Sequence, residues 1–583
     1  MPRWYLAVFG TYLAWALARS FGGVDWPSAR LRAGEWLVTA LLAASALGLS
    51  FRDRRKALAA LMAGASLAVL MAFGQMIWGR TLLSPYAVDA RSVTFTAERV
   101  ASTFGNPIFF GAFLVLVFPL AAAGAARRLE ARARIFPWAA AGGLMLAGIA
   151  LAASRGAFLG LAAALGLLAL AVPRLRRWAG VAAASAAALL MVLGLWRPGL
   201  VEHLLVFGDP GRLLMWKTAV RMWHDSPLTG AGLGQFTQRY PCVQLEVATP
   251  GDAGFGVNAV HAHNDFLEEA AELGLPGVLL FAAALLGLLA LPGAGASAWG
   301  VRAGIFGVAV QSLFNYIMRT APTMTFVWVC PALFVLPAGD GGTRAPRKAD
   351  LGWVLAVVVL VLLFRPFVRS SYVQMGLAYQ DAGTEASARN PVRAPEFFGK
   401  SVRYFDRALL CLPDDAQTRI GFQRGKTLFD SGDLPGAQAE FAGDLDRFPC
   451  YPEGYGHLGV VYGVRAMNGE MELLPKAEGL IQHALRLRPG GKEAANDYNS
   501  LANIRVLTGN ETGALMSYRE ALRCNPGFVE AASNAVRLLL RRKRRAEAQD
   551  VVRALLGANP DDPEARAMAR AVGVAVAAPG MAP

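Results

Sequence analysis

Residues 136–172 have the sequence FPWAAAGGLMLAGIALAASRGAFLGLAAALGLLALAV. Two apolar runs, Phe136–Ala153 and Gly156–Val172, are separated only by Ser154 and Arg155. A helix rises about 1.5 Å per residue and the apolar core of a bilayer is about 30 Å thick, so each run predicts a short membrane-spanning helix. Because an arginine at a membrane end needs an anion or water, Arg155 is a candidate functional residue.

Similar apolar runs recur from the N-terminus to Phe367. The other candidate spans are Trp4–Ala18, Trp36–Leu49, Ala57–Trp78, Ile108–Ala126, Trp178–Trp196, Gly277–Leu291, Ala296–Ile317, Thr323–Pro337 and Leu351–Phe367. Hydrophobic residues make up 55% of the chain and charged residues 17%, a balance typical of membrane proteins. We therefore predict an all-α fold in which residues 1–367 form a bundle of about eleven spans.

Basic clusters between the predicted spans indicate the orientation. They are Arg52, Arg54, Arg55 and Lys56; Arg127, Arg128, Arg132 and Arg134; Arg174, Arg176 and Arg177; and Arg344, Arg347 and Lys348. If the spans alternate, all these clusters lie on one side, which is the cytoplasmic side because positive loops stay inside. The N-terminus is then inside, as a retained first span without a cleavage site. The loop of about 197–276 and everything after Phe367 lie outside. This topology also accounts for the formal charge of +15, so we expect no nucleic acid as a partner.

The chain after Phe367 differs in kind, because it is charged and contains no spanning run. Proline recurs there at Pro413, Pro449, Pro489, Pro526 and Pro560. A bulky apolar residue precedes each proline by eight positions, at Phe405, Phe441, Ile481, Tyr518 and Val552, and a leucine precedes it by four, at Leu409, Leu445, Leu485, Leu522 and Leu556. This spacing places both side chains on one face of a helix that ends at the proline. We predict an α-solenoid over 368–583 that resembles tetratricopeptide repeats and is either a binding surface for a protein or glycan or a stacking module only.

The spacing of cysteine and histidine argues against a metal site. The five cysteines include no CxxC pair, and we expect neither a zinc site nor a disulfide framework. His261 and His263 could bind a metal with Asp265 or Glu268, but no third ligand has a diagnostic spacing. We therefore predict no metal, and we interpret His261 as a residue that caps a helix.

The predicted outer loop contains GDPGRLLMWKTAVRMWHDSPLTGAGLGQF at 208–236. Leu213, Trp216, Val220 and Trp223 recur in it at helical spacing, which predicts an amphipathic helix. Its tryptophans are typical of an element that lies at a membrane interface. The glycines that follow permit tight turns, but they lack the spacing of a P-loop.

Four segments resemble one family. The sequence AHNDFLEEAAELGLPG at 262–277 is similar to the signature of the O-antigen ligase and polymerase superfamily. That group includes lipopolysaccharide O-antigen ligases, O-antigen polymerases and protein O-oligosaccharyltransferases. RVASTFGNPIFFGAFL at 99–114, ASRGAFLGL at 153–161 and GRLLMWKTAVRMWHDSPLTGAGLGQF at 211–236 resemble further segments of the family. The likeness covers about 36–337, with the same order of segments.

The resemblance implies transfer of a glycan from a polyprenyl-diphosphate carrier to a hydroxyl at the periplasmic face of a bacterial inner membrane. We predict His263 as the base, because imidazole titrates near neutral pH. By resemblance, Arg212 binds the diphosphate, since arginine pairs with phosphate oxygens and keeps its charge. Arg155 is the second expected ligand. Further candidate substrate-binding residues are Arg99, Arg221, Arg319, Asn264, which fixes the histidine backbone or a sugar hydroxyl, and Glu272, which is either structural or functional.

The acceptor stays open at this point. It is the lipid A core for a ligase, a growing glycan for a polymerase, or a protein for an O-oligosaccharyltransferase, and we rank the ligase type first. No metal or other cofactor is expected, and the other expected partners are membrane lipids and a protein bound by the repeats. A transporter of lipid-linked glycans and a membrane-anchored scaffold are the non-enzymatic alternatives. A transporter would be expected to contain an inverted repeat of spans, which we do not see in the sequence. A scaffold leaves the arginine and histidine segments unexplained.

Overall fold

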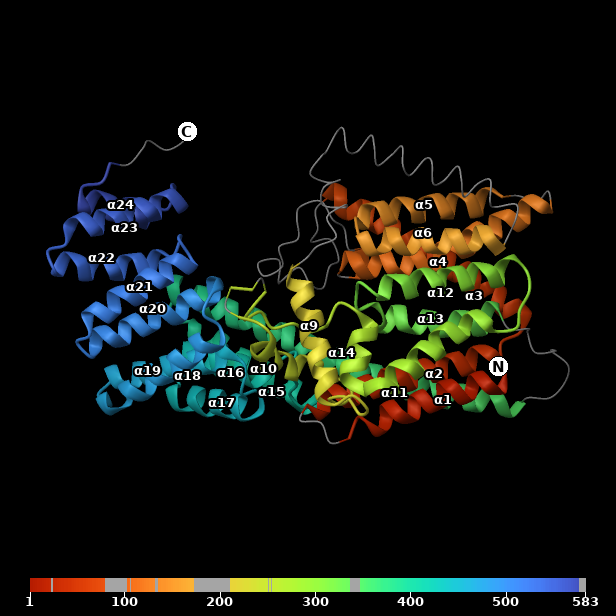
Figure 1. The fold of residues 1–583 in the computed structure, drawn as a ribbon, viewed down its shortest axis with the longest axis horizontal. Coiled ribbons are helices and arrows are strands. Elements are labelled where there is room, and N and C mark those ends of the chain that lie inside the picture. The colour runs from red at the N-terminus through yellow and green to blue at the C-terminus, as the bar shows by residue number, and fades with distance from the viewer. Residues whose placement is uncertain are drawn as a thin grey trace. The chain divides into compact units, whose positions relative to one another are not determined.

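The computed structural model describes residues 1–21, 25–78, 102–104, 106–131, 135–171, 210–249, 251–252, 254–335 and 346–575. Over these residues the chain is helical and contains no β-strand, which confirms the predicted all-α class. The chain forms two compact units (Figure 1). The first contains Met1–Arg239 and Ala259–Pro366, and the second contains Tyr240–Asn258 and Phe367–Pro583.

The first unit is built from apolar helices. They are α1 (Arg3–Ala18), α2 (Trp26–Leu47), α3 (Phe51–Trp78), α4 (Pro107–Glu130), α5 (Phe136–Ala152), α6 (Arg155–Ala171), α9 (Pro210–Asp225), α11 (Asp265–Gly287), α12 (Ala296–Ser312) and α13 (Ala321–Phe334), with short 3-10 turns η2 (Ser102–Phe104), η3 (Leu288–Ala290) and η4 (Ile317–Arg319). Two more helices, α10 (Phe236–Val247) and α14 (Pro346–Arg389), run from the first unit into the second.

Several of these helices can cross a membrane. Phe51–Ile77, Pro107–Leu129 and Asp265–Ala290 are long and apolar enough, and Phe136–Ala152, Arg155–Ala171 and Thr323–Phe334 are shorter apolar helices. Every predicted span falls on a helix except Trp178–Trp196, which lies outside the described residues. The total of about eleven spans stays a prediction.

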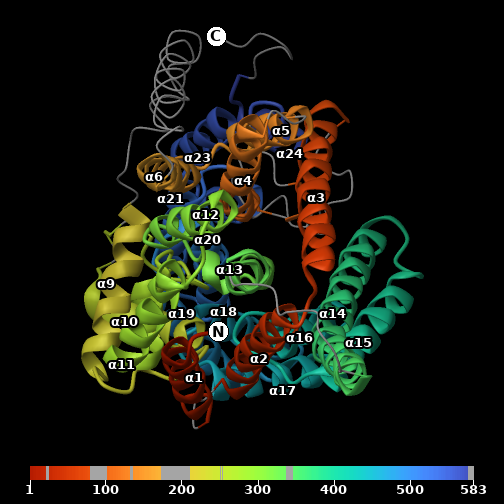
Figure 2. The same cartoon turned by 90° about the vertical axis from the view of Figure 1, so that its right-hand side faces the viewer.

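Small residues allow the central helices of this unit to touch. α4, α6 and α12 lie side by side in both views (Figures 1 and 2). A Cβ atom at Gly304 would lie 2.2 Å from the carbonyl oxygen of Leu116, and one at Gly160 would lie 2.6 Å from the carbonyl oxygen of Gly307. Such backbone contact between small residues is the usual way for helices to pack in a membrane, where burial of apolar surface gives little driving force.

The second unit is a stack of helix pairs. Its helices are the C-terminal part of α14, α15 (Ala394–Cys411), α16 (Ile420–Asp430), α17 (Leu434–Arg447), α18 (Pro452–Met467), α19 (Leu474–Leu487), α20 (Gly491–Leu507), α21 (Glu511–Cys524), α22 (Val529–Arg541), α23 (Arg545–Ala558) and α24 (Pro563–Val572), with the turn η5 (Met471–Leu473). Each of α15, α17, α19, α21 and α23 ends two residues before one of the recurring prolines, as predicted.

The recurring bulky residues form the core of this stack. Phe405, Phe441, Ile481, Tyr518 and Val552 are all buried. Glycines on the facing helix make room for three of them. A Cβ atom at Gly376 would lie 2.6 Å from the Phe405 ring, and those at Gly425 and Gly459 would lie 2.8 Å from Phe441 and 2.5 Å from Ile481. The repeat pattern in the sequence is therefore the packing pattern of large against small side chains in the fold.

A segment from the predicted outer loop belongs to the second unit. We call Tyr240–Asn258 the strap. A disulfide joins Cys242 of the strap to Cys450, which lies just before α18, with their Cα atoms 5.2 Å apart. The expectation of no disulfide framework was therefore wrong for this pair, because a sequence separation of 208 hides the pairing from any local pattern. The Asn258 side chain also donates to Glu453 of α18 at 3.5 Å.

Candidate active site

His261 and His263 lie in the loop that precedes α11, and we call His261–Asn264 the histidine loop. Asn264 is the N-cap residue, and its side-chain oxygen accepts the backbone N–H of Leu267 at 3.1 Å. His263, just before it, has a left-handed φ of 53°. A non-glycine residue rarely adopts this conformation, so the chain makes a sharp, fixed turn as it enters the helix. The side-chain oxygen of Asn264 is thus engaged by the start of α11.

Tyr316 brings the two histidines together. Its ring stacks on that of His261, with centroids 4.3 Å apart, and meets the ring of His263 edge-on at 4.7 Å. Phe109, from the Gly-Asn-Pro segment at the start of α4, meets the same tyrosine edge-on at 5.2 Å. Three aromatic side chains from two separate parts of the chain thus contact Tyr316.

Glu268 holds the other side of His261. Its Oε1 lies 2.9 Å from His261 Nδ1, and its Oε2 accepts the backbone N–H of Ala262 at 2.8 Å. The interpretation of His261 as a capping residue was therefore wrong, because Asn264 caps the helix and His261 pairs with a buried carboxylate. Sequence reasoning missed Glu268 as a partner, although it follows one helical turn after the capping residue.

Arg319 lies in a buried acidic cluster on α11. Its guanidinium contacts Glu272 at 2.6 Å, Glu269 at 3.0 Å and Glu268 at 3.5 Å. Glu269 also accepts the Tyr12 hydroxyl at 3.2 Å. Arg319 and Glu272, which we expected as candidate substrate ligands, are both paired within the protein, and these pairs join η4 to α11.

Glu272 has a further partner at the start of α10. Its Oε1 accepts the backbone N–H of Phe236 at 3.0 Å. The carbonyl oxygen of Arg319 in turn accepts from Arg32 at 2.8 Å. These contacts make the acidic cluster a tie between α2, η4, α10 and α11.

α9 forms where the amphipathic pattern predicts it and places Arg212 at its start. It packs on α11 through a buried face that includes Leu214, Ala219 and Met222. Arg212 Nη1 donates to the carbonyl oxygen of Phe314 at 3.0 Å. Arg221, two turns later, pairs with Asp225 at 3.3 Å in a partly exposed position.

The connection between α12 and α13 joins all these parts, and we call Leu313–Thr320 the junction. Phe314 contacts Arg212, Tyr316 contacts the histidines, and Arg319 contacts the acidic cluster. The backbone N–H of Met318 donates to Asp265 at 3.0 Å. Two segments that are far apart in the sequence, the start of α9 and the stretch from His261 to Glu272, therefore meet at one short connection.

The Ser-Arg-Gly segment also reaches the junction. Ala153 ends α5 with a left-handed φ of 44°, and Arg155 begins α6. A Cβ atom at Gly156 would lie 2.3 Å from the side-chain nitrogen of Asn315, so this glycine permits direct contact with the junction. Arg155 is adjacent in the chain to that contact. Arg99 lies outside the described residues.

The glycine-rich loop before α10 pairs with the backbone of α11. The N–H groups of Ala231 and Gly232 donate to the carbonyl oxygens of Ala271 and Glu272, each at 2.8 Å. α11 is broken at this point, because Gly274 has a φ of 70°. The glycines therefore allow two backbones to approach, and these N–H groups are used within the protein.

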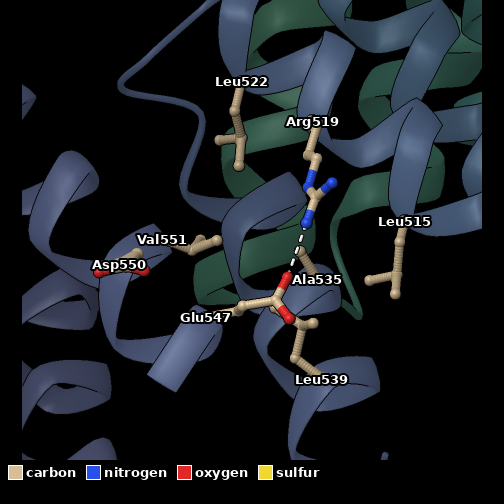
Figure 3. Close-up of a pocket in the computed structure, with 8 residues that line it drawn as sticks. All are labelled: Leu515, Arg519, Leu522, Ala535, Leu539, Glu547, Asp550 and Val551. Atoms are coloured by element: carbon tan, nitrogen blue, oxygen red, sulfur yellow. Dashed lines mark hydrogen bonds and ion pairs between the residues drawn. The ribbon is translucent and has the colours of Figure 1, made fainter. Parts of the chain in front are cut away.

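Within the described ranges, no group of three or more His, Cys, Asp and Glu side chains is arranged to hold a metal. A small hollow of about 130 Å³ lies in the second unit between α21, α22 and α23. Figure 3 shows Arg519 and Glu547 pointing toward one another across it, at 2.7 Å, with Leu515 and Val551 on its walls. Small-molecule sites usually enclose roughly 300–1,000 Å³, so this hollow is too small for a glycan.

Two parts of the chain match models of known protein families. Residues 140–282 match the family model described as O-antigen ligase, and residues 506–572 match the tetratricopeptide repeat. The first match includes most of α5, all of α6 and α9, and the histidine loop, while the junction lies beyond it. No curated protein matches the sequence.

Solved structures of three proteins are similar to about a third of this chain. The thermophilic TPR protein TTC0263 from Thermus thermophilus is 20% identical over 35% of this chain and 98% of its own, with a TM-score of 0.28. MamA is 18% identical over 33% of this chain and 96% of its own, with a TM-score of 0.23. YrrB, a TPR protein with an unusual peptide-binding site, is 16% identical over 33% of this chain and 90% of its own, with a TM-score of 0.23.

Proposed function

We propose that this chain, an integral membrane protein that combines an O-antigen ligase domain with tetratricopeptide repeats, transfers a glycan from a polyprenyl-diphosphate carrier to an acceptor hydroxyl. One observation carries the proposal: a histidine loop and an arginine from a separate helix meet on the same junction. Glycan transfer from a diphosphate needs both a base and a stable cation, and the junction brings both kinds of group together.

His263 is the proposed base. Its imidazole accepts the proton of the acceptor hydroxyl as the hydroxyl oxygen forms a bond to the anomeric carbon of the donor. The bond from that carbon to the diphosphate oxygen breaks, and the electron pair leaves with the diphosphate. A single displacement of this kind inverts the anomeric centre.

Arg212 is the proposed ligand of the diphosphate. A guanidinium binds phosphate oxygens through paired, charge-assisted hydrogen bonds, each worth about 1.5–3 kcal/mol. One N–H of the Arg212 guanidinium donates to the Phe314 carbonyl oxygen at 3.0 Å, and a guanidinium carries five N–H donors in all. Arg155 is the second proposed ligand, with Arg99 and Arg221 as weaker candidates. We assign Asn264, Glu272 and Arg319 to the support of the site.

The proposed reaction takes place at the periplasmic face of a bacterial inner membrane, with a ligase-type acceptor such as the lipid A core ranked first. We propose that the C-terminal repeats lie in the periplasm and bind a protein partner.

The test uses purified full-length protein in lipid vesicles with a lipid-linked glycan donor and an acceptor. We expect His263→Ala to lower transfer by about 100-fold or more, because general base catalysis contributes on that scale. Arg212→Ala should lower transfer by about 10-fold to 100-fold, since it removes charge-assisted bonds to the leaving group.

His224→Ala and Lys217→Ala are matched controls, because both side chains lie exposed on α9 outside the junction. They should keep the activity of the wild type. Full activity in both His263→Ala and Arg212→Ala would remove the proposed mechanism.

A further inference from the structure

The junction contains one aromatic residue that touches both histidines, and it lies outside the region matched by the O-antigen ligase family. We propose that the ring of Tyr316 is the positioning element of the active site, which fixes the orientation of the His263 imidazole for proton transfer. The inference rests on the proposed function, because it concerns the base of that reaction.

The ring of Tyr316 is held from two sides. Its stacking partner, His261, is bound by the buried carboxylate of Glu268 at 2.9 Å. Phe109, at the start of α4, contacts it edge-on at 5.2 Å. Aromatic pairs at such distances contribute about 0.5–1.5 kcal/mol each, so the tyrosine ring has a defined place before any substrate binds.

The contact with Tyr316 bears on the orientation of the His263 ring. Its left-handed backbone fixes where its side chain leaves the chain, but not the rotation of the imidazole plane. The edge-on contact with Tyr316, at an interplanar angle of 88°, restricts that rotation. Because a proton-transfer geometry that is about 1 Å wrong can cost about 100-fold in rate, a fixed plane has catalytic value.

The hydroxyl of Tyr316 differs from the ring in its contacts. Among the residues that the structure describes, no hydrogen bond is made by this hydroxyl. Removal of the hydroxyl therefore breaks no hydrogen bond to a described residue. Removal of the ring breaks its three aromatic contacts, with Phe109, His261 and His263. The proposed role belongs to the ring, and phenylalanine should replace it.

The experiment compares Tyr316→Phe with Tyr316→Leu in the full-length, vesicle-reconstituted protein. We expect Tyr316→Phe to stay within about threefold of the wild type and Tyr316→Leu to lose about 30-fold to 100-fold in kcat, with little change in KM for the lipid-linked donor. Wild-type kcat in Tyr316→Leu, or equal losses in both variants, would overturn the proposal. Equal losses would assign the role to the hydroxyl.

Phe109→Leu provides a variant that loosens the tyrosine without touching either histidine. It should lower kcat in the same direction but less than Tyr316→Leu, and this comparison keeps the test valid where Tyr316→Leu inserts poorly. Unchanged kcat in Phe109→Leu together with a poorly inserted Tyr316→Leu would count against the proposal.

A second readout does not depend on glycan transfer. Diethyl pyrocarbonate modifies accessible imidazoles, and mass spectrometry of the peptide with His261 and His263 gives the rate of modification. We expect faster modification in Tyr316→Leu than in the wild type and in Tyr316→Phe. If the wild type transfers no glycan but this difference appears, the proposed function fails while the ring contact stands. Equal rates in all three proteins would count against the ring contact itself.

Discussion

At the scale of single residues, the acidic cluster around Arg319 is the least expected feature of an apolar helix bundle. Three buried glutamates of α11 share one guanidinium. Buried ion pairs are often no more stabilising than well-packed apolar residues of similar size, so stability alone is a weak reason to keep them. Their geometry offers a better reason, since each carboxylate also binds another part of the site, namely His261, Tyr12 and the backbone of Phe236.

We expect Arg319→Met to destabilise the first unit strongly. The variant leaves three carboxylates buried without their cation, and removal of one partner of a buried pair costs about 3–5 kcal/mol. Thermal unfolding of the protein in detergent measures the loss. Arg221→Ala is the control, because the partly exposed pair with Asp225 should contribute about 0–1 kcal/mol. Equal melting temperatures for Arg319→Met and Arg221→Ala would show that the cluster does not support the fold.

At the scale of elements, the glycine-rich loop crosses α11 at its broken turn, where the two backbones are in contact. Gly230 and Gly274 both have a positive φ, and Cβ atoms there would lie 2.3 Å and 2.5 Å from backbone atoms of the opposite segment. The loop hydrogen bonds to Ala271 and Glu272 close this crossing. Glu272, the last glutamate of the acidic cluster, lies on the same turn of α11. The crossing therefore also holds this part of the cluster next to the loop before α10.

Gly274→Ala tests this crossing against a matched glycine. Gly274 has φ 70° and ψ −172°, and Gly295 has φ 92° and ψ 169°. Both conformations cost a non-glycine residue about 1–3 kcal/mol. An added Cβ atom at Gly274 would meet the backbone of Leu228 at 2.5 Å, whereas one at Gly295 would meet nothing within 4 Å. We expect Gly274→Ala to lower both the melting temperature and glycan transfer, and Gly295→Ala to lower the melting temperature slightly without loss of transfer. Similar behaviour of the two variants would mean that close approach at Gly274 is unimportant.

The sequence predicts the helices better than it predicts the tertiary contacts between them. Apolar length placed the membrane helices, and the spacing of Phe405 and Pro413 placed the ends of the repeat helices, because these signals are local. The junction was missed except for Arg319, since Asn315 and Tyr316 look like the ordinary end of an apolar run. Their contacts are with residues more than 50 positions away, which no local pattern records.

At the scale of the whole molecule, the strap connects the second unit along the chain to the histidine loop of the first unit. The residues that flank the strap are joined in the first unit, where the Thr237 hydroxyl donates to the Val260 carbonyl oxygen at 2.9 Å. His261 follows immediately after that contact. The body of the strap belongs to the second unit, where the disulfide and Asn258 fasten it. A protein partner bound to the repeats would therefore act on a unit that is covalently joined to the histidine loop.

The disulfide also provides a test of the proposed orientation. Disulfides persist outside the reducing cytoplasm, so a strap and repeats that face the periplasm should keep Cys242 and Cys450 oxidised. Cys330, Cys411 and Cys524 are the free cysteines. We expect mass spectrometry to find these three alkylated when membranes are dissolved in denaturant with iodoacetamide, and all five after reduction. The double variant Cys242→Ser and Cys450→Ser should give three in both conditions, because it leaves only the free cysteines. Alkylation of all five wild-type cysteines without reductant would place the repeats on the cytoplasmic side. The histidine loop, which follows the strap in the chain, would then lie on that side too. The proposed lipid-linked donor is not presented there.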